Sequence, residues 1–150
     1  MVDEKDNVWA GTWGDGLSMY DINKDKFTRY KNIPGNRNSL SLNNISDVYE
    51  DRSGGIWIAT VGGGLNYFNT ETSDFLHYRQ DANSNLWLPD DFPHSVYEDK
   101  KGNIWIGTEA VGVFLLNPEK NDMVHFSSDP DDSGSIRGKK VFTITEAAVD

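Results

Sequence analysis

Short apolar runs alternate with polar, glycine-containing turns along the whole chain. The Asp-x-x-Gly sequence at Asp51–Gly54 is typical of a tight turn, because Asp favours its first position and Gly accepts a positive φ. No run has the 3.6-residue period of a helix. The pattern around this turn predicts four short strands: Ile45–Glu50, Ile56–Thr60, Leu65–Phe68 and Phe75–Arg79.

The second strand of this set differs from the others, because its residues do not alternate between apolar and polar. Ile56, Trp57 and Ile58 are apolar at three successive positions. A strand that faces solvent on one side alternates, whereas a strand covered on both sides is apolar throughout. We therefore expect Ile56–Thr60 to lie between two neighbouring layers.

The whole pattern recurs every 48 residues without an insertion. Four strands in a unit of about 40–50 residues are typical of a β-propeller blade. The predicted fold class is therefore all-β, with about three four-stranded propeller blades of 48 residues each. The positions that recur in all three copies include Trp9, Trp57 and Trp105; Thr12, Thr60 and Thr108; and Gly16, Gly64 and Gly112.

The register of the repeats divides the chain into units. Residues 1–50 hold the first repeat, which lacks its innermost strand, and the innermost strand of the next blade. Residues 51–98 form the second repeat, residues 99–146 form the third, and residues 147–150 are a tail. The third repeat ends in an orphan innermost strand at Val141–Glu146.

Three blades are too few to close a ring, since propellers have about four to eight blades. We expect the orphan strand to pair with Val8–Thr12 of a second molecule, because an unpaired strand edge readily adds another strand. Two chains that exchange this strand would close a ring of six blades. The predicted assembly is a homo-oligomer, with a dimer favoured, in which strand exchange closes the incomplete propeller.

The composition limits the partners. The net charge of −10 repels phosphate backbones and anionic lipids, so we expect no nucleic-acid partner and no direct membrane contact. The absence of cysteine excludes disulfides and thiolate chemistry. We expect no signal peptide within this sequence, since Met1 leads directly into polar residues.

The repeated tryptophans have two interpretations, as packing residues or as stacking platforms for a ligand. Trp9, Trp57 and Trp105 lie in the middle of the most apolar strand of each unit, whereas ligand platforms are usually presented on loops. The sequence favours packing, because buried aromatic side chains contribute most to core stability.

Residues that break the repeat are better candidates for a ligand site, since the scaffold does not require them. Trp13 and Asp15 stand in the turn between the second and third strands of their blade, and the other candidates follow in the linker before the third blade. These two types of loop open on the same face of a propeller. An exposed indole stacks on the apolar face of a sugar while carboxylates accept hydrogen bonds from its hydroxyls; the alternative is that these side chains cover a blade edge. The candidate ligand-binding residues are Trp13, Asp15, Trp87, Asp90, Asp91 and His94.

Neither a metal site nor catalytic chemistry is expected, and no cofactor is implied. Asp129–Gly134 resembles the start of a calcium loop, but the twelfth position is Lys140 where the bidentate Glu is needed. Glu50, Glu98 and Glu146 recur in every unit, whereas a catalytic carboxylate pair would be singular. A carboxylate-based glycan-cleaving propeller remains the less favoured alternative.

The unit resembles the two-component regulator propeller repeat. The resemblance rests on Glu98–Thr108, on Gly63-Gly64-Leu65, on Phe75–Tyr78 and on Ser39-Leu40-Ser41, and it extends over the whole chain. In that family, long arrays of such repeats form the extracytoplasmic sensor of hybrid two-component histidine kinases of Bacteroidetes, which sense oligosaccharides and regulate glycan utilisation.

The resemblance implies a periplasmic, non-catalytic sensor fragment of a membrane-anchored kinase. Its partners would be an oligosaccharide ligand and further propeller blades of the parent chain. The alternative from another class is a structural or protein-interaction scaffold without a small-molecule ligand.

Overall fold

The structure, a computed structural model, describes residues 1–79, 88 and 92–147, which form three antiparallel sheets. The strands of the first sheet are β1 (Val8–Gly11), β2 (Leu17–Asp21) and β3 (Lys26–Tyr30). Those of the second are β4 (Ile45–Glu50), β5 (Ile56–Thr60), β6 (Gly64–Asn69) and β7 (Asp74–Tyr78). Those of the third are β8 (Pro93–Glu98), β9 (Ile104–Thr108), β10 (Val113–Asn117) and β11 (Asp122–Phe126).

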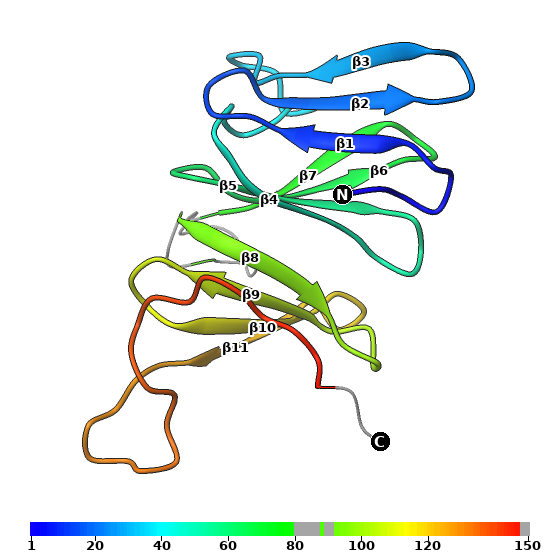
Figure 1. The fold of residues 1–150 in the computed structure, drawn as a ribbon. Coiled ribbons are helices and arrows are strands. Elements are labelled where there is room, and N and C mark those ends of the chain that lie inside the picture. The colour runs from blue at the N-terminus through cyan, green and yellow to red at the C-terminus, as the bar shows by residue number, and fades with distance from the viewer. Residues whose placement is uncertain (80–87, 89–91, 148–150) are drawn as a thin grey trace.

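Each sheet is a meander in which consecutive strands are neighbours, and the three sheets stack face to face (Figure 1). The two four-stranded sheets also share a local irregularity. The register shifts between Ile45 and Asp47 in β4 and between Pro93 and Ser95 in β8, which are equivalent positions one repeat apart. The predicted fold class, an incomplete set of all-β propeller blades, is confirmed.

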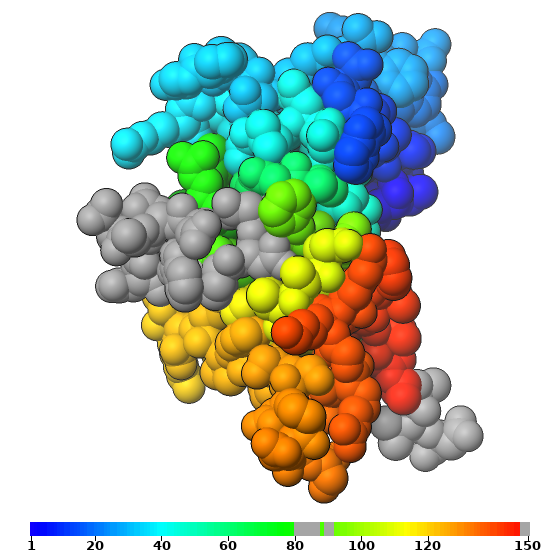
Figure 2. Space-filling view, turned by 90° about the vertical axis from the view of Figure 1, so that its left-hand side faces the viewer, coloured from blue at the N-terminus to red at the C-terminus, as the bar shows by residue number. Residues whose placement is uncertain are grey.

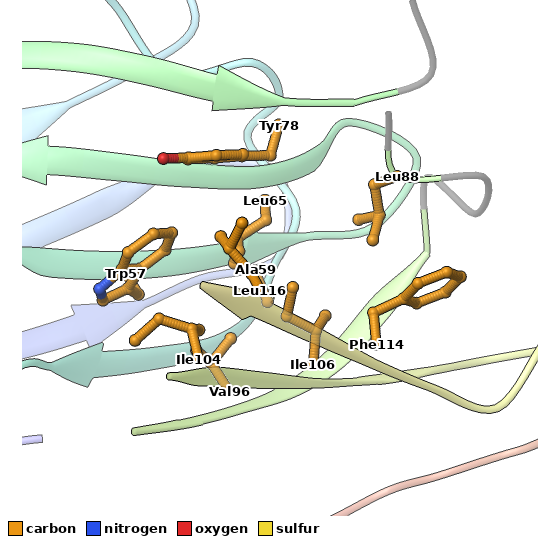
Figure 3. Close-up of a cluster of buried hydrophobic side chains, with 10 residues drawn as sticks. All are labelled: Trp57, Ala59, Leu65, Tyr78, Leu88, Val96, Ile104, Ile106, Phe114 and Leu116. Carbon is orange, nitrogen blue, oxygen red and sulfur yellow. The ribbon is translucent and has the colours of Figure 1, made fainter. Parts of the chain in front are cut away.

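Two apolar layers hold the sheets together. The layer between the second and third sheets contains Trp57 and Tyr78 on one side and Ile104, Ile106 and Leu116 on the other (Figure 3). A second layer joins the first and second sheets and includes Trp9, Ile56, Ile58 and Phe68. Strand β5 contributes to both layers and is buried at all five positions, as its uninterrupted apolar sequence predicts.

The first sheet lacks a full innermost strand. Met1 and Val2 alone stand in that place: the Trp9 amide donates to the Met1 carbonyl at 2.9 Å, and Val2 forms an isolated bridge with Val8. In the described residues, no strand lies on that side of Ala10 and Gly11.

At the other end of the chain, residues 141–146 are not part of a strand, although we expect one there. The segment nevertheless begins in the position of a first strand. The Val141 amide donates to the Thr108 carbonyl at 2.9 Å, as the Ile45 amide at the start of β4 donates to the Thr12 carbonyl at 2.9 Å. The difference arises because a strand is defined by its hydrogen-bonded neighbour, and no neighbouring strand pairs with this segment in the described residues.

Candidate functional site

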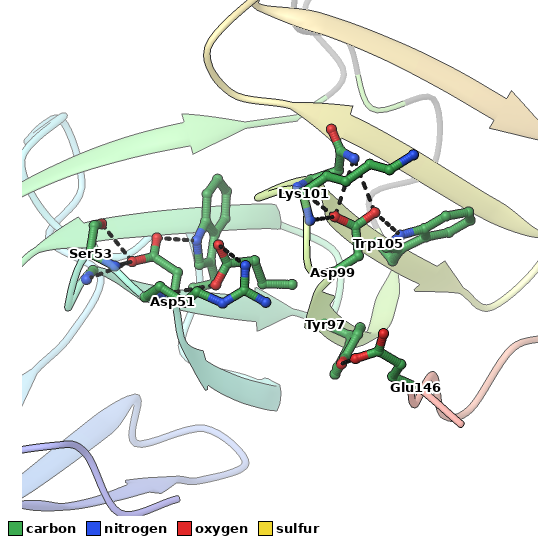
Figure 4. Close-up of polar contacts among 12 residues, drawn as sticks. Asp51, Ser53, Tyr97, Asp99, Lys101, Trp105 and Glu146 are labelled. Carbon is green, nitrogen blue, oxygen red and sulfur yellow. Dashed lines mark hydrogen bonds and ion pairs between the residues drawn. The ribbon is translucent and has the colours of Figure 1, made fainter. Parts of the chain in front are cut away.

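The repeated tryptophans are part of the scaffold, each tied to the turn that precedes its strand. The indole Nε1 of Trp57 donates to Asp51 Oδ2 at 2.8 Å, and Asp51 Oδ1 accepts the backbone amides of Ser53 and Gly55 (Figure 4). One carboxylate therefore closes the turn and fixes the ring. The same bond recurs from Trp9 to Asp3 at 2.7 Å and from Trp105 to Asp99 at 3.0 Å.

In two of the three copies these hydrogen bonds lower the pKa of the aspartate, namely at Asp3 and Asp99. Partial burial raises the pKa of Asp99, but hydrogen bonds from Asn103, Trp105 and turn amides outweigh it and lower that pKa to about 2. The pKa of Asp3 is also lowered, because the hydrogen bonds from Trp9 and Asn7 outweigh its burial. An ionised carboxylate accepts a stronger hydrogen bond from the indole N–H than a neutral carboxyl group does. This stronger bond stabilises the turn.

The repeated glutamates join neighbouring sheets, a role that the sequence does not reveal. Glu50 Oε2 at the end of β4 accepts the Glu4 amide of the first sheet at 2.8 Å. Glu98 Oε2 at the end of β8 accepts the Arg52 amide of the second sheet at 2.9 Å, one repeat later. Because each carboxylate bridges two blades, the recurrence of this residue is explained by stacking.

The repeat-breaking residues Trp13, Asp15 and His94 lie at one end of the stack, which we call the loop face: the turns β1–β2, β5–β6 and β9–β10 with the described residues that directly precede β4, β8 and residue 141. The Gly14 amide donates to the Asn43 carbonyl and the Glu109 amide to the Phe92 carbonyl, so each turn is held against the next segment. Ser46 Oγ donates to the Pro93 carbonyl at 2.6 Å and connects two neighbouring blades. Figure 2 looks onto this face, where turn regions of the N-terminal (blue) and third (yellow) sheets reach the surface.

Trp13 is the most exposed large apolar side chain among the described residues, at 71%. Its backbone forms an isolated bridge with Asn44, which fixes the turn while the ring stays open to solvent. Two residues further on, Asp15 accepts a hydrogen bond from Lys31 Nζ at 2.8 Å. This bond and the positive charge lower the pKa of Asp15, so its carboxylate is ionised and can accept further hydrogen bonds at neutral pH.

His94 belongs to a second group of the loop face. Its Nε2 contacts Glu109 Oε2 in the β9–β10 turn, and Lys140 Nζ donates to Glu109 Oε1 at 2.5 Å. The Phe142 ring lies 5.6 Å from the His94 ring and 4.7 Å from Lys140 Nζ. The hydrogen bonds from Lys140 and His94 lower the pKa of Glu109.

The structure brings His94 together with three residues that the sequence reasoning missed, namely Glu109, Lys140 and Phe142. Each of these residues stands at a position of the repeat that holds a different residue type in each copy. Glu109 stands where Trp13 and Val61 stand in the other copies, and Phe142 stands where Ser46 and His94 stand. Comparing all three copies for variable positions on one end of the blade would have found them.

The other predicted site residues are not joined directly. Within the described residues, no hydrogen bond, ion pair or ring contact connects Trp13, Asp15 and His94 to one another. Trp87, Asp90 and Asp91 lie outside the described residues. The arrangement offers an open indole at Trp13, exposed aromatic rings at Phe92 and Phe142 and ionised carboxylates, which suit a ligand with both an apolar surface and hydroxyl groups.

The described residues also bear on two other kinds of site. No group of three or more His, Asp or Glu side chains is gathered there in a way that could hold a metal ion. Those residues also include no helix long and apolar enough to cross a membrane.

A family model described as "Two component regulator propeller" matches residues 39–62 and 88–110. These two stretches are one repeat apart and end in the β5–β6 and β9–β10 turns. No curated protein matches the chain.

Solved structures share the fold. One is the extracellular domain of a protein assigned as a hybrid two-component system of B. thetaiotaomicron, with a TM-score of 0.72, 24% identity and coverage of 80% of this chain and 16% of the other. A second domain of the same description and organism has a TM-score of 0.65, 18% identity and coverage of 96% and 24%. The surface component PorZ of the type-IX secretion system of Porphyromonas gingivalis has a TM-score of 0.53, 22% identity and coverage of 81% and 18%. The chain therefore spans less than a quarter of the length of each of these proteins.

Proposed function

We propose that this chain, which carries two-component regulator propeller repeats, is a non-catalytic ligand-binding part of a bacterial sensor that acts outside the cytoplasm. The fold it shares with the extracellular domains of hybrid two-component systems supports this assignment. In such a sensor whole propellers would rearrange as rigid bodies when ligand binds, and a kinase outside this chain would respond.

The ligand that the loop face suits best is an oligosaccharide. The observation that carries this proposal is Trp13, an indole 71% exposed at a position where the other two copies have Val61 and Glu109. The repeat does not require a ring at this position, and the exposed indole is free to stack on the apolar face of a ligand. A pyranose offers a matching apolar face, and ionised Asp15 and Glu109 can accept hydrogen bonds from its hydroxyl groups.

A glycan array of neutral and acidic plant and host oligosaccharides, followed by calorimetric titration of the best array ligand, tests the proposal. Trp13→Ala should weaken binding about tenfold, since an aromatic contact contributes about 0.5–1.5 kcal/mol beyond burial. Ile22→Ala is the matched control, because Ile22 is 55% exposed in the β2–β3 turn and not on the loop face.

The alternatives give different results in the same experiment. No binding to any array glycan would favour the structural or protein-interaction scaffold. Equal affinity of the wild-type and Trp13→Ala proteins would remove Trp13 from the site. Release of reducing sugar from the bound oligosaccharide would indicate the glycan-cleaving alternative and contradict a non-catalytic module.

A further inference from the structure

Residues 31–44 join the first sheet to the second and form a linker held by its own hydrogen bonds. Residues 33–36 have the hydrogen bond and the positive φ of a type II turn: the Asn36 amide donates to the Ile33 carbonyl at 2.9 Å, and Gly35 has φ 82°. Ser39 Oγ accepts the Ile33 amide at 3.0 Å and donates to the Asn36 carbonyl at 2.9 Å. The shape of the linker therefore does not depend on a ligand.

Further hydrogen bonds fix the linker to the sheets on both sides of it. The Asn32 amide donates to Asn43 Oδ1 at 2.7 Å, and the Asn43 carbonyl accepts the Gly16 amide of the β1–β2 turn at 3.0 Å. From the second sheet, His77 Nε2 in β7 donates to the Ser39 carbonyl at 2.7 Å. The linker is thus held next to the loop face and against the end of β7.

A cleft of about 230 Å³ lies between the linker and the end of β7, and we call it the arginine cleft. Arg37 of the linker and Arg79, which follows β7, both line it. Within the described residues, no carboxylate forms an ion pair with either guanidinium group. Asn36 also lines the cleft; its Oδ1 accepts the Asn38 amide at 2.9 Å, so its Nδ2 group is the part that can donate to a ligand. The cleft therefore combines positive charge with a hydrogen-bond donor.

The two positive charges are particular to this place in the chain. One repeat later, the residues at the equivalent positions are Asn85 and Ser127, which are both neutral. The repeat therefore does not require the arginines. Because the chain carries 24 acidic and 14 basic residues, its surface as a whole attracts cations, whereas this cleft favours an anion.

His77 is a further lining residue, and it forms part of the wall without adding charge. Its pKa is lowered because the ring is half-buried, and the Arg79 charge lowers it further; together they outweigh its hydrogen bond to the Ser39 carbonyl. The imidazole is therefore neutral at pH 7. The positive charge of the cleft comes from the two arginines.

We propose that the arginine cleft binds the anionic group of an acidic sugar, a carboxylate or a sulfate, between Arg37 and Arg79. A guanidinium group presents its N–H donors in a planar fork that matches the oxygens of such a group, and it stays charged at physiological pH. Asn36 Nδ2 can donate a further hydrogen bond to the same oxygens. That a sugar carries the anion rests on the proposed function, whereas the anion site rests on the cleft itself.

Proton–nitrogen correlation NMR of the whole chain tests the site, because it detects the Nε–H groups of the arginines directly. The probes are sodium sulfate, glucuronate and glucose 6-sulfate at constant ionic strength, with glucose as the neutral match of both sugars. We expect each anion to shift the Nε–H signals of Arg37 and Arg79 until they saturate. Glucose should leave both signals in place.

Arg37→Gln and Arg79→Gln should each weaken the binding of all three anions about tenfold, because each removes a charged hydrogen-bond donor. Both arginines are exposed, so the amide spectra of the variants should otherwise match that of the wild type. Lys120→Gln is the matched control, since it removes one positive charge from an exposed position in the β10–β11 turn. Its affinity for the anions should not change.

Signals that do not saturate, or equal affinities of the wild type and both arginine variants, would overturn the anion site. Binding of sulfate without either acidic sugar would overturn the sugar as the carrier and indicate a free inorganic anion. If no array glycan binds but the three anions do, the proposed function fails and the anion site stands. If an array glycan binds through Trp13 and no anion shifts the arginine signals, the proposed function stands and the anion site fails.

Discussion

Replacing Trp57 with alanine should lower the free energy of unfolding by about 3–5 kcal/mol, the range for loss of a large buried aromatic side chain. The Trp57 side chain is 2% exposed and packs against Tyr67 at 4.8 Å and Tyr78 at 5.4 Å. Its removal leaves a cavity between the second and third sheets. The substitution also removes the hydrogen bond that Trp57 Nε1 donates to Asp51 Oδ2 at 2.8 Å. Urea unfolding at one fixed protein concentration measures the change, since association would shift apparent stability.

Trp13→Ala is the matched control, because the same ring is deleted at a site that is 71% exposed. Surface substitutions of this kind usually change stability by less than about 0.5 kcal/mol. A loss of less than about 0.5 kcal/mol in Trp57→Ala would mean that Trp57 does not have the packing role assigned to it. A loss at Trp13 as large as that at Trp57 would also mean that the scaffold needs the Trp13 ring.

Replacing Gly64 with alanine should cost at least about 3 kcal/mol, because two unfavourable effects act together. The residue has φ +72°, a conformation that side chains with Cβ rarely adopt, and a Cβ would stand 2.4 Å from the Tyr78 carbonyl oxygen. The opposing group is backbone and cannot rotate away. Gly16 and Gly112 make the same close approach to carbonyls of their own sheets, at 2.4 and 2.5 Å, which explains why glycine recurs there.

Gly54→Ala separates the two effects. Gly54 has nearly the same φ, +78°, but nothing lies within 4 Å of an added Cβ. Asp6, the equivalent residue of the first copy, adopts φ 63° without being glycine. Gly54→Ala should therefore cost only about 1–2 kcal/mol, the penalty for a left-handed residue. If both variants lose the same stability in urea unfolding, the close approach to Tyr78 contributes nothing.

Much of the fold is predictable from the sequence, because identical positions in three copies reinforce each other. The predicted strands Ile45–Glu50 and Ile56–Thr60 match β4 and β5 residue for residue. Strand β6 begins one residue early, at Gly64, because the register pairs that glycine with Thr60 although glycine is a poor strand former. Strand propensity alone would not assign Gly64 to a strand, whereas its backbone pairing with Thr60 does.

The roles that depend on stacking are not visible in the sequence. The spacing shows that Glu50 and Glu98 recur, but only the arrangement of the sheets shows that each accepts an amide from the preceding blade. The contacts of Glu109 with His94 and with Lys140 are also not visible in the sequence, because the three residues come from separate segments of the chain. Such contacts follow from three-dimensional packing between repeats, whereas the pattern within one repeat gives only local structure.

The central claim is that repeated residues build the scaffold and repeat-breaking residues on the loop face bind the ligand. Fluorine NMR of the protein labelled with 5-fluorotryptophan tests it directly, because the chain has five tryptophans that single Trp→Phe variants can assign. On saturation with the best array oligosaccharide, the account predicts that the Trp13 signal shifts while the signals of buried Trp9 and Trp57 stay in place. A shift of Trp9 or Trp57 with an unchanged Trp13 signal would contradict it.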